Sequence, residues 1–199
     1  IERVVGVLSP LAQEKGLSLE LDYDQGMAGI FFGDGARIGQ ILTNLLGNAI
    51  KFTDSGSVTV KVSGIHGSEA TEATIAVHDT GSGILMDRLE DIFEDFVVFA
   101  HGVGRQNRGD GLGLSISRKV ARLMGGDLAV QSTIDIGSVF VLTLPLTRNS
   151  ADPVPADHGT PSALPTEPVD RKDVLIVEDN AINRTVLRDM LERLGHVVT

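Results

Sequence analysis

Residues 34–53 read DGARIGQILTNLLGNAIKFT, and the rest of the chain is organised around this stretch. Its apolar residues recur every three or four positions, which predicts a helix with one broad face packed on a core: Ile38, Ile41, Leu42, Leu45, Leu46 and Ala49. A narrow polar stripe runs beside that face: Arg37, Gln40, Asn44, Asn48 and Lys51. Asparagine is a poor helix former because its amide competes for nearby backbone groups. Asn44 and Asn48, one turn apart, therefore indicate a binding surface or an unusually composed solvent-exposed stripe.

Composition limits the kinds of site that the chain can carry. Of 199 residues, 42% are hydrophobic and only 4% aromatic, with no Trp, so the core is expected to be aliphatic with seven Phe as its large members. The formal charge of −10 argues against nucleic-acid binding, which needs a basic surface. It also means that a polyphosphate ligand needs a local site of backbone amides, lysine and a metal ion. Because Cys is absent, disulfides and thiolate metal sites are excluded.

The sequence contains neither a membrane-spanning segment nor a signal peptide. No run of about 18 apolar residues occurs, and the first residues lack the charged and apolar regions of a signal peptide. We therefore expect a soluble, cytoplasmic chain without membrane contact. A membrane anchor elsewhere in a longer parent protein remains compatible with these residues.

Apolar periodicity predicts an α+β first domain over residues 1–146. The expected helices are 1–13, broken near Pro10, then 34–53 and 112–124, with a helical turn within 84–99. The expected strands are 17–22, 30–32, 58–62, 73–77, 127–132 and 138–144, with a polar hairpin over 64–72 and a mobile loop over 102–111. This order predicts a two-layer α/β sandwich, in which a mixed sheet of five or six strands carries helices on one face.

Composition changes after the first domain. Five of the seven prolines lie between residues 153 and 168, so residues 147–171 are predicted to be an extended linker. A short apolar strand over 173–177, an amphipathic helix over 182–194 and the start of a strand at 196 follow. One such unit cannot bury its own core. Residues 172–199 are therefore expected to begin a second, α/β domain.

Two glycine-rich stretches are compatible with ligand binding, and each also has a plain structural explanation. Asp79-Thr80-Gly81-Ser82-Gly83 follows a predicted strand and offers a carboxylate beside backbone that a planar ligand can approach, although a simple turn explains it equally well. A predicted helix opens with Gly109-Asp110-Gly111-Leu112-Gly113-Leu114. Glycines at a helix start either expose free N–H groups that bind phosphate or only cap the helix. The spacing is not that of a P-loop, a protein kinase or a Rossmann fold.

The order of the three stretches resembles the ATP-binding domain of bacterial sensor histidine kinases, which share the Bergerat (GHKL) fold with gyrase and mismatch-repair ATPases. Residues 34–53 resemble the N-box, 79–84 the G1 box, 92–96 the F-box and 109–114 the G2 box. Gly125-Gly126-Asp127 and Gly137-Ser138-Val139-Phe140 also fit. The resemblance covers about residues 1–146.

This resemblance implies a site for Mg²⁺ and ATP. Asn48 would hold Mg²⁺, Asn44 would lie beside it and Lys51 would neutralise phosphate charge, while Asp79 would accept the adenine amino group. The other implied nucleotide-binding residues are Phe52, Gly81, Gly83, Ile84, Phe96, Gly109, Gly111, Leu112 and Gly113. Residues 97–108 would form a lid over ATP, in which Arg105 and Arg108 contact phosphate or solvent, and Asp110 replaces a commoner Thr.

Asn44 distinguishes a kinase from an ATPase. Related ATPases carry a glutamate there as the general base on water, and an amide cannot serve as a base. Transfer to a protein histidine is therefore favoured, with Asn44 and Lys51 as the catalytic residues acting through position and charge. The five histidines (66, 78, 101, 158 and 196) lack the context of an acceptor helix. The acceptor is thus expected on a separate dimerisation domain of a homodimeric parent. A GHKL-type ATPase and a non-catalytic nucleotide-binding module are the alternatives.

Residues 173–180 resemble the first strand and acidic pair of a response-regulator receiver domain, which has a flavodoxin-like fold. Glu178 and Asp179 would bind Mg²⁺ there, in a site still lacking the phosphoacceptor aspartate. The alternative is a charged loop that caps a helix. The whole chain resembles part of a hybrid sensor histidine kinase, whose parent could be anchored in the bacterial inner membrane.

Overall fold

A computed structural model describes residues 1–24, 27, 31–67, 70–97, 111–148, 172–176, 184, 188, 191–192 and 195–198. The chain divides into two compact units, Ile1–Asn149 and Ser150–Thr199. Residues 147 and 148 continue the last strand of the first unit, and the rest of the predicted linker lies outside the described residues. The domain limits at 146 and 172 stay predictions.

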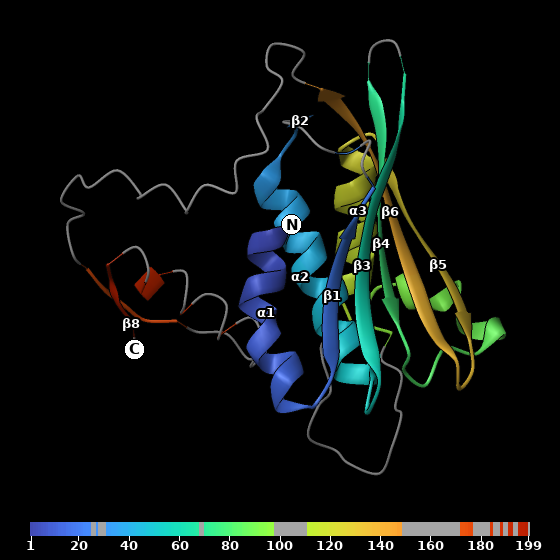
Figure 1. Cartoon of the computed structure of the whole chain (residues 1–199), viewed down its shortest axis with the longest axis horizontal. Coiled ribbons are helices and arrows are strands. Elements are labelled where there is room, and N and C mark those ends of the chain that lie inside the picture. Colours follow the sequence, from blue (N-terminus) through green and yellow to red (C-terminus); the bar gives the residue numbers. More distant parts are fainter. Residues whose placement is uncertain are drawn as a thin grey trace. The chain divides into compact units, whose positions relative to one another are not determined.

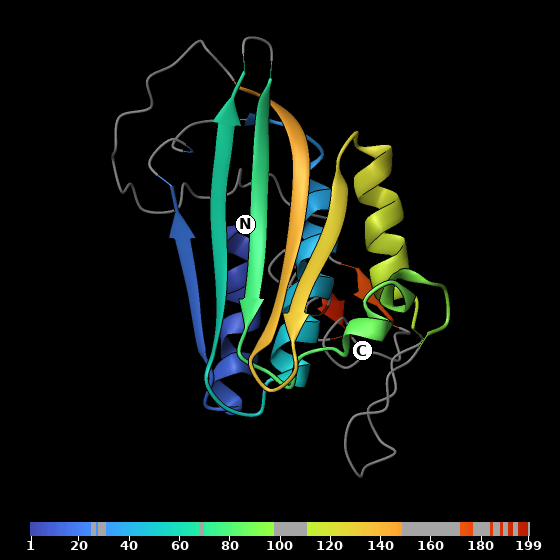
Figure 2. The same ribbon diagram turned by 90° about the vertical axis from the view of Figure 1, so that its right-hand side faces the viewer.

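The first unit is built on a six-stranded mixed sheet in the order β1-β3-β4-β6-β2, with β5 paired to β6 (Figure 2). Its strands are β1 Ser18–Tyr23, β2 Phe31–Phe32, β3 Ser57–His66, β4 Thr71–Asp79, β5 Asp127–Thr133 and β6 Gly137–Arg148. The β1–β3 pair is parallel and all other pairs in this sheet are antiparallel. The predicted mixed sheet is confirmed.

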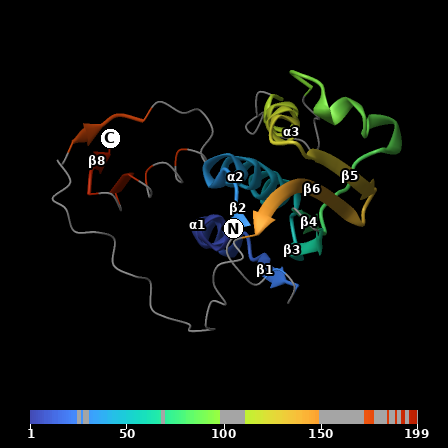
Figure 3. The same ribbon diagram turned by 90° about the horizontal axis from the view of Figure 1, so that it is seen from above.

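Three helices cover one face of this sheet, as Figures 1 and 3 show: α1 Glu2–Glu14, α2 Gly35–Phe52 and α3 Gly113–Leu123. Side chains at helical spacing on α2 and at alternate positions on the strands meet in an aliphatic core, whose largest members include Leu42, Leu45, Leu46, Val58, Val60, Val77, Leu128 and Leu142. Asp34 caps α2 by accepting a hydrogen bond from the backbone N–H of Arg37 at 3.1 Å. The predicted two-layer sandwich with helices on one face is confirmed.

Two expectations about local structure were wrong. Helix α1 runs through Pro10 without a break, since the buried side chains on either side of the proline, Leu8 and Ala12, hold it on the core. Strands β3 and β4 reach His66 and Thr71, so most of the predicted hairpin over 64–72 is strand. In this part of the sheet Glu72 and Ile65 are exposed, whereas Thr71 is buried on the same face of β4 as Ala73 and Ile75.

The second unit contains a short parallel pair, β7 Asp173–Val174 and β8 Val197–Val198. Strand β7 is shorter than the predicted 173–177, and Leu175 is exposed. The predicted helix over 182–194 is described at four positions, all of them helical. Glu178 and Asp179 lie outside the described residues, so the receiver fragment and its metal site stay predictions.

Within the described part of the chain, no helix is both long enough and apolar enough to cross a membrane.

Candidate functional site

The polar stripe of α2 lies beside the core, as its sequence predicts. Asn44, Asn48 and Lys51 are half-buried, whereas Ile41 and Leu45 on the neighbouring face are fully buried. Burial lowers the pKa of the Lys51 ammonium. Its Nζ lies 5.2 Å from the centre of the Phe52 ring, and Phe52 is 40% exposed. The C-terminal turn of α2 therefore presents a cation and an accessible aromatic face.

Asp79 ends β4 and lies opposite Ser138 of β6. Its Oδ1 accepts hydrogen bonds from the backbone N–H groups of Gly81, at 2.9 Å, and Ser138, at 3.3 Å. Burial raises the pKa of this carboxyl, and the two N–H donors oppose that rise by stabilising the charge. The carboxyl group is thus held in a fixed orientation at reduced contact with water.

The loop after Asp79 needs both of its glycines. A Cβ on Gly81 would lie 2.9 Å from Asp79 Oδ1 and would overlap the carbonyl oxygen of Phe52. Gly83 adopts a φ of +70°, and a Cβ there would overlap the carbonyl oxygen of Thr133. The backbone N–H of Ser82 also donates to Phe52 O at 3.4 Å. Close packing of backbone on backbone places Asp79 beside the C-terminal end of α2.

Sequence reasoning missed the serines that hold this loop on the β5–β6 hairpin. The backbone N–H of Ile84 donates to Ser132 Oγ at 2.8 Å, and Ser132 Oγ donates to Gly137 O at 2.9 Å. Ser132 Oγ and Ser138 Oγ are 3.1 Å apart. The alternation of the two strands could have paired these serines, since they face each other across the hairpin. It contained no signal for the contact with Ile84.

The segment from Ile84 into the predicted F-box forms two short 3-10 turns, Met86–Arg88 and Asp91–Phe93, where one helical turn is predicted. The stretch is attached to α3 at two points. The Arg118 guanidinium lies 4.5 Å from the centre of the Phe93 ring, and Lys119 Nζ lies 2.7 Å from Asp95 Oδ2. The Lys119 hydrogen bond lowers the pKa of Asp95. These contacts fix the predicted F-box against the helix that follows the predicted lid.

The two ends of the predicted lid lie against each other. Phe96, which is 74% exposed, and Gly111 have φ angles of +66° and +68°. A Cβ on Gly111 would lie 2.7 Å from the carbonyl oxygen of Val97. Residues 98–110 lie outside the described part of the chain, and they include the predicted contacts Arg105, Arg108 and Gly109 as well as Asp110.

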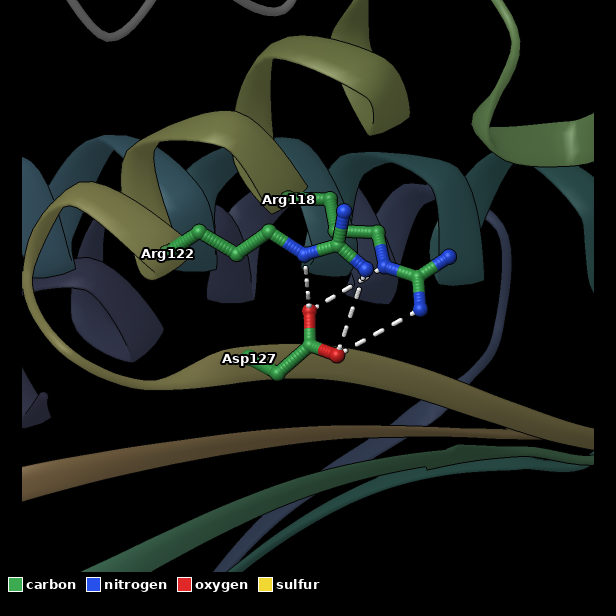
Figure 4. A network of polar contacts seen from close by, with 3 residues as sticks. All are labelled: Arg118, Arg122 and Asp127. Atoms are coloured by element: carbon green, nitrogen blue, oxygen red, sulfur yellow. Dashed lines mark hydrogen bonds and ion pairs between the residues drawn. The ribbon is translucent and has the colours of Figure 1, made fainter.

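Helix α3 is joined to β5 by two arginines that share one aspartate (Figure 4). The Nε of Arg118 lies 3.1 Å, and that of Arg122 3.0 Å, from Asp127 Oδ1. Each guanidinium also reaches Oδ2, at 3.3 and 3.5 Å respectively. The hydrogen bond from Arg118 is the largest of the effects that hold the pKa of the Asp127 carboxyl far below its usual range. The sequence identifies Gly125-Gly126-Asp127 as part of the family resemblance, but it does not predict that Arg118 and Arg122 bind Asp127.

We expect Asp127→Asn to lower the free energy of unfolding by about 1 kcal/mol at pH 7, because the group is partly solvent-exposed and its ion pairs are screened. Since the folded pKa is depressed, the stabilisation is present above the unfolded pKa of about 4 and is lost as pH falls through the folded value. Urea unfolding at pH 7 and pH 3 measures both effects. Asp54→Asn, in an exposed turn, is the charge-matched control. An equal loss in both variants would contradict a specific role of the network.

Asn44 connects α2 to α3. Its Nδ2 donates to the buried Ser117 Oγ at 3.0 Å, and a Cβ on Gly113 would overlap the Asn44 amide. Among the described residues, no side chain caps the N-terminus of α3. The N–H groups of its first turn suit an anion. Asn44 thus helps place that turn beside the polar stripe of α2.

Ser117→Ala should cost about 1 kcal/mol of stability, since it leaves a half-buried amide donor without its acceptor. A double-mutant cycle with Asn44→Ala, read by urea unfolding, should show a coupling of about 0.5–1 kcal/mol. Additive effects of the two substitutions would contradict the contact. Ser115→Ala is the matched control, because Ser115 is also buried on α3 but bonds Leu112 O and the Asp95 carboxylate instead of Asn44.

The predicted site residues in the described part of the chain lie on helix α2 or beside it. Gly113 contacts its middle through Asn44, and Gly81 contacts its end through Phe52. The structure therefore brings the N-box, the G1 box and the start of α3 together around one helix. The arrangement offers a fixed carboxylate for an amino group, a lysine and a helix N-terminus for phosphate, and amide oxygens suited to a hard metal ion.

Residues 33–148 match the model of the histidine kinase-, DNA gyrase B- and HSP90-like ATPase family. The chain belongs to this family. The resemblance to histidine kinases is also confirmed by relatives in which the match extends well beyond the family model. The chain is 38% identical over 199 residues to the sensor histidine kinase AruS of Pseudomonas aeruginosa, covering 100% of the chain and 19% of AruS.

Two further relatives show the same pattern. The chain is 39% identical over 191 residues to the aerobic respiration control sensor protein ArcB of Escherichia coli, covering 94% of the chain and 23% of ArcB. It is 36% identical over 190 residues to the autoinducer 2 sensor kinase/phosphatase LuxQ of Vibrio cholerae, covering 95% of the chain and 22% of LuxQ. The chain thus spans only about a fifth of the length of these relatives.

Solved structures share the fold. Full-length ShkA in complex with AMPPNP matches with a TM-score of 0.65 and 30% identity, over 99% of this chain and 38% of ShkA. The mycobacterial sensor histidine kinase MprB matches with a TM-score of 0.57 over 74% of this chain and 95% of that chain, at 24% identity. The predicted GHKL fold of an ATP-binding catalytic domain is therefore confirmed.

Proposed function

We propose that the first unit binds ATP with Mg²⁺ and transfers the γ-phosphoryl group to a histidine on a separate dimerisation domain. The observation that carries this proposal is the side chain of Asn44. It stands where related ATPases hold a catalytic base, and its Nδ2 is bonded to Ser117 on α3. An amide cannot take a proton from water. This family member is therefore suited to phosphoryl transfer by positioning and charge.

The residues present fit the ligand. The oriented carboxylate of Asp79 suits the adenine amino group, with Phe52, Ile84 and Phe96 as apolar neighbours and Gly81 and Gly83 shaping the loop. Lys51 and the backbone of Gly111, Leu112 and Gly113 suit the phosphates, to which the resemblance adds Gly109, and the Asn48 amide oxygen suits Mg²⁺. Bound Mg²⁺ supplies neutralisation of the charge on the transferred group.

The proposal extends to partners that this chain does not contain. A helical dimerisation domain of the parent would supply the histidine, and the parent would be a homodimer. Residues 172–199 would begin a receiver domain, with Glu178 and Asp179 as part of its Mg²⁺ site. The site would operate in the cytoplasm, in a parent anchored in the inner membrane of a bacterium.

Calorimetric titration of the chain with ATP and Mg²⁺, followed by a transfer assay, tests this function. We expect binding by the chain alone, and an acid-labile phosphohistidine only when the helical domain of the parent is added. Hydrolysis by the chain that is lost in Asn44→Ala, without transfer, would favour the ATPase. Binding with neither reaction would favour a non-catalytic module. Absence of binding would overturn the proposal altogether.

A further inference from the structure

Lys15 lies between α1 and β1, outside every motif described above, and its side chain reaches the end of α2. Its Nζ is 2.8 Å from the carbonyl oxygen of Ile50, 3.1 Å from that of Lys51 and 2.9 Å from that of Thr53. These three acceptors lie at least 35 residues away in sequence. An ammonium group has three donors, so the head group of Lys15 is matched to the three oxygens.

These carbonyls are the groups that a helix end leaves without intrahelical partners. Thr53 satisfies the carbonyl of Ala49 through its backbone N–H, at 3.1 Å, and its Oγ1, at 2.7 Å. Lys15 binds the carbonyls that follow, where the negative end of the helix dipole also favours a cation. The last turn of α2 is therefore capped by a residue from another element.

The backbone of Lys15 is itself held in place. The N–H of Gly16 donates to Gln13 O, and that of Leu17 donates to Ala12 O, both at 2.9 Å. Gly16 has a φ of +70°, so a side chain there would be strained. This pattern of hydrogen bonds is a Schellman motif. The side chain thus extends from a fixed point at the end of α1.

The turn that Lys15 caps connects the two ends of the nucleotide site. It carries Lys51 and Phe52, and it follows Asn48 on the same helix. The carbonyl oxygen of Phe52 lies between two that Lys15 binds, and it accepts the N–H of Ser82 in the loop after Asp79. A displacement of this turn would therefore move the lysine predicted to face phosphate and the loop predicted to face adenine together.

We propose that Lys15 is a positioning residue for nucleotide binding, which holds the last turn of α2 in register with the loop after Asp79. It acts through the carbonyls of residues 50, 51 and 53 and touches neither the nucleotide nor the reacting atoms. The proposal rests on the proposed function, because it assigns the same site to ATP.

The test compares the affinities of variants of this chain for AMPPNP with Mg²⁺ by calorimetry. Lys15→Met keeps the aliphatic stem and removes the charge and donors, and we expect it to weaken binding by about 3- to 10-fold. Lys15→Arg retains both and should restore affinity to within about 2-fold. Lys61→Met, on the exposed side of β3, is the matched control and should bind like the unaltered chain. Lys15→Gln replaces Lys15→Met if the latter does not fold.

A second control separates positioning from loss of stability. Val62→Ala shortens a buried side chain in the middle of β3, and temperatures are chosen so that both variants remain folded. Val62→Ala should lower the melting temperature but leave affinity unchanged. Affinity of Lys15→Met equal to that of the unaltered chain, or an equal loss in Val62→Ala, would overturn the positioning role. No binding by the unaltered chain would instead overturn the proposed function.

Discussion

Asp79→Asn is expected to weaken ATP binding by roughly 10- to 100-fold, since it replaces a charged acceptor with an amide of the same shape. Asp79 Oδ1 is already used by the N–H groups of Gly81 and Ser138, so the loop should keep its fold in the variant. The expected loss of affinity therefore comes from weaker recognition of the adenine amino group and not from unfolding of the loop. Calorimetry with AMPPNP measures it.

The same variant should be more stable than the unaltered chain at pH 7. Burial raises the pKa of Asp79, so its contribution to stability is full below the unfolded pKa of about 4 and is lost as pH rises through the folded value. Asparagine has no charge to desolvate. Thermal unfolding should show an advantage for Asp79→Asn that shrinks as pH falls toward 4.

Asp135→Asn is the matched control, because it makes the same change on the exposed turn between β5 and β6, and asparagine tolerates the φ of +59° there. It should leave affinity and stability nearly unchanged. If Asp79→Asn bound AMPPNP as tightly as this control, Asp79 would not be the adenine acceptor.

Asn48→Asp should abolish measurable binding of ATP with Mg²⁺. The substitution changes the charge of the proposed metal ligand and places a half-buried carboxylate beside the phosphates. Two like charges about 4 Å apart repel by about 4 kcal/mol at an effective dielectric constant of 20, which corresponds to a loss of roughly 100- to 1,000-fold.

Gln40→Glu provides the control for Asn48→Asp, since it makes the same amide-to-carboxylate change two turns earlier on the polar stripe of α2, where the side chain is exposed. Calorimetry should show near-normal affinity for this control. Unchanged affinity in Asn48→Asp would refute its assignment as the Mg²⁺ ligand. A loss of equal size in Gln40→Glu would mean that the overall charge of α2, and not one position, governs binding.

Local pattern was sufficient to predict most of the architecture. The spacing of Leu42, Leu45 and Leu46 required an amphipathic helix, and the alternation of Val58, Val60 and Val62 required a half-covered strand, because each places its apolar side chains on one side. The same logic separated Asn44 and Asn48 from the core face. The order of the motifs then indicated the family, since that order is specific even where each motif alone is not.

The sequence by itself thus determined the helix with its polar stripe, the mixed sheet and the glycines that the loop after Asp79 requires. Only the tertiary structure decided that α1 continues through Pro10, that Asn44 bonds Ser117, and that Lys15 caps α2. It also decided that Ser132 holds Ile84 and that Asp127 is shared by two arginines. The physical reason is whether an interaction lies within one element or joins two of them. Periodicity follows from the geometry of one element, whereas these contacts join side chains to partners on other elements, whose distance is set only when the whole core packs.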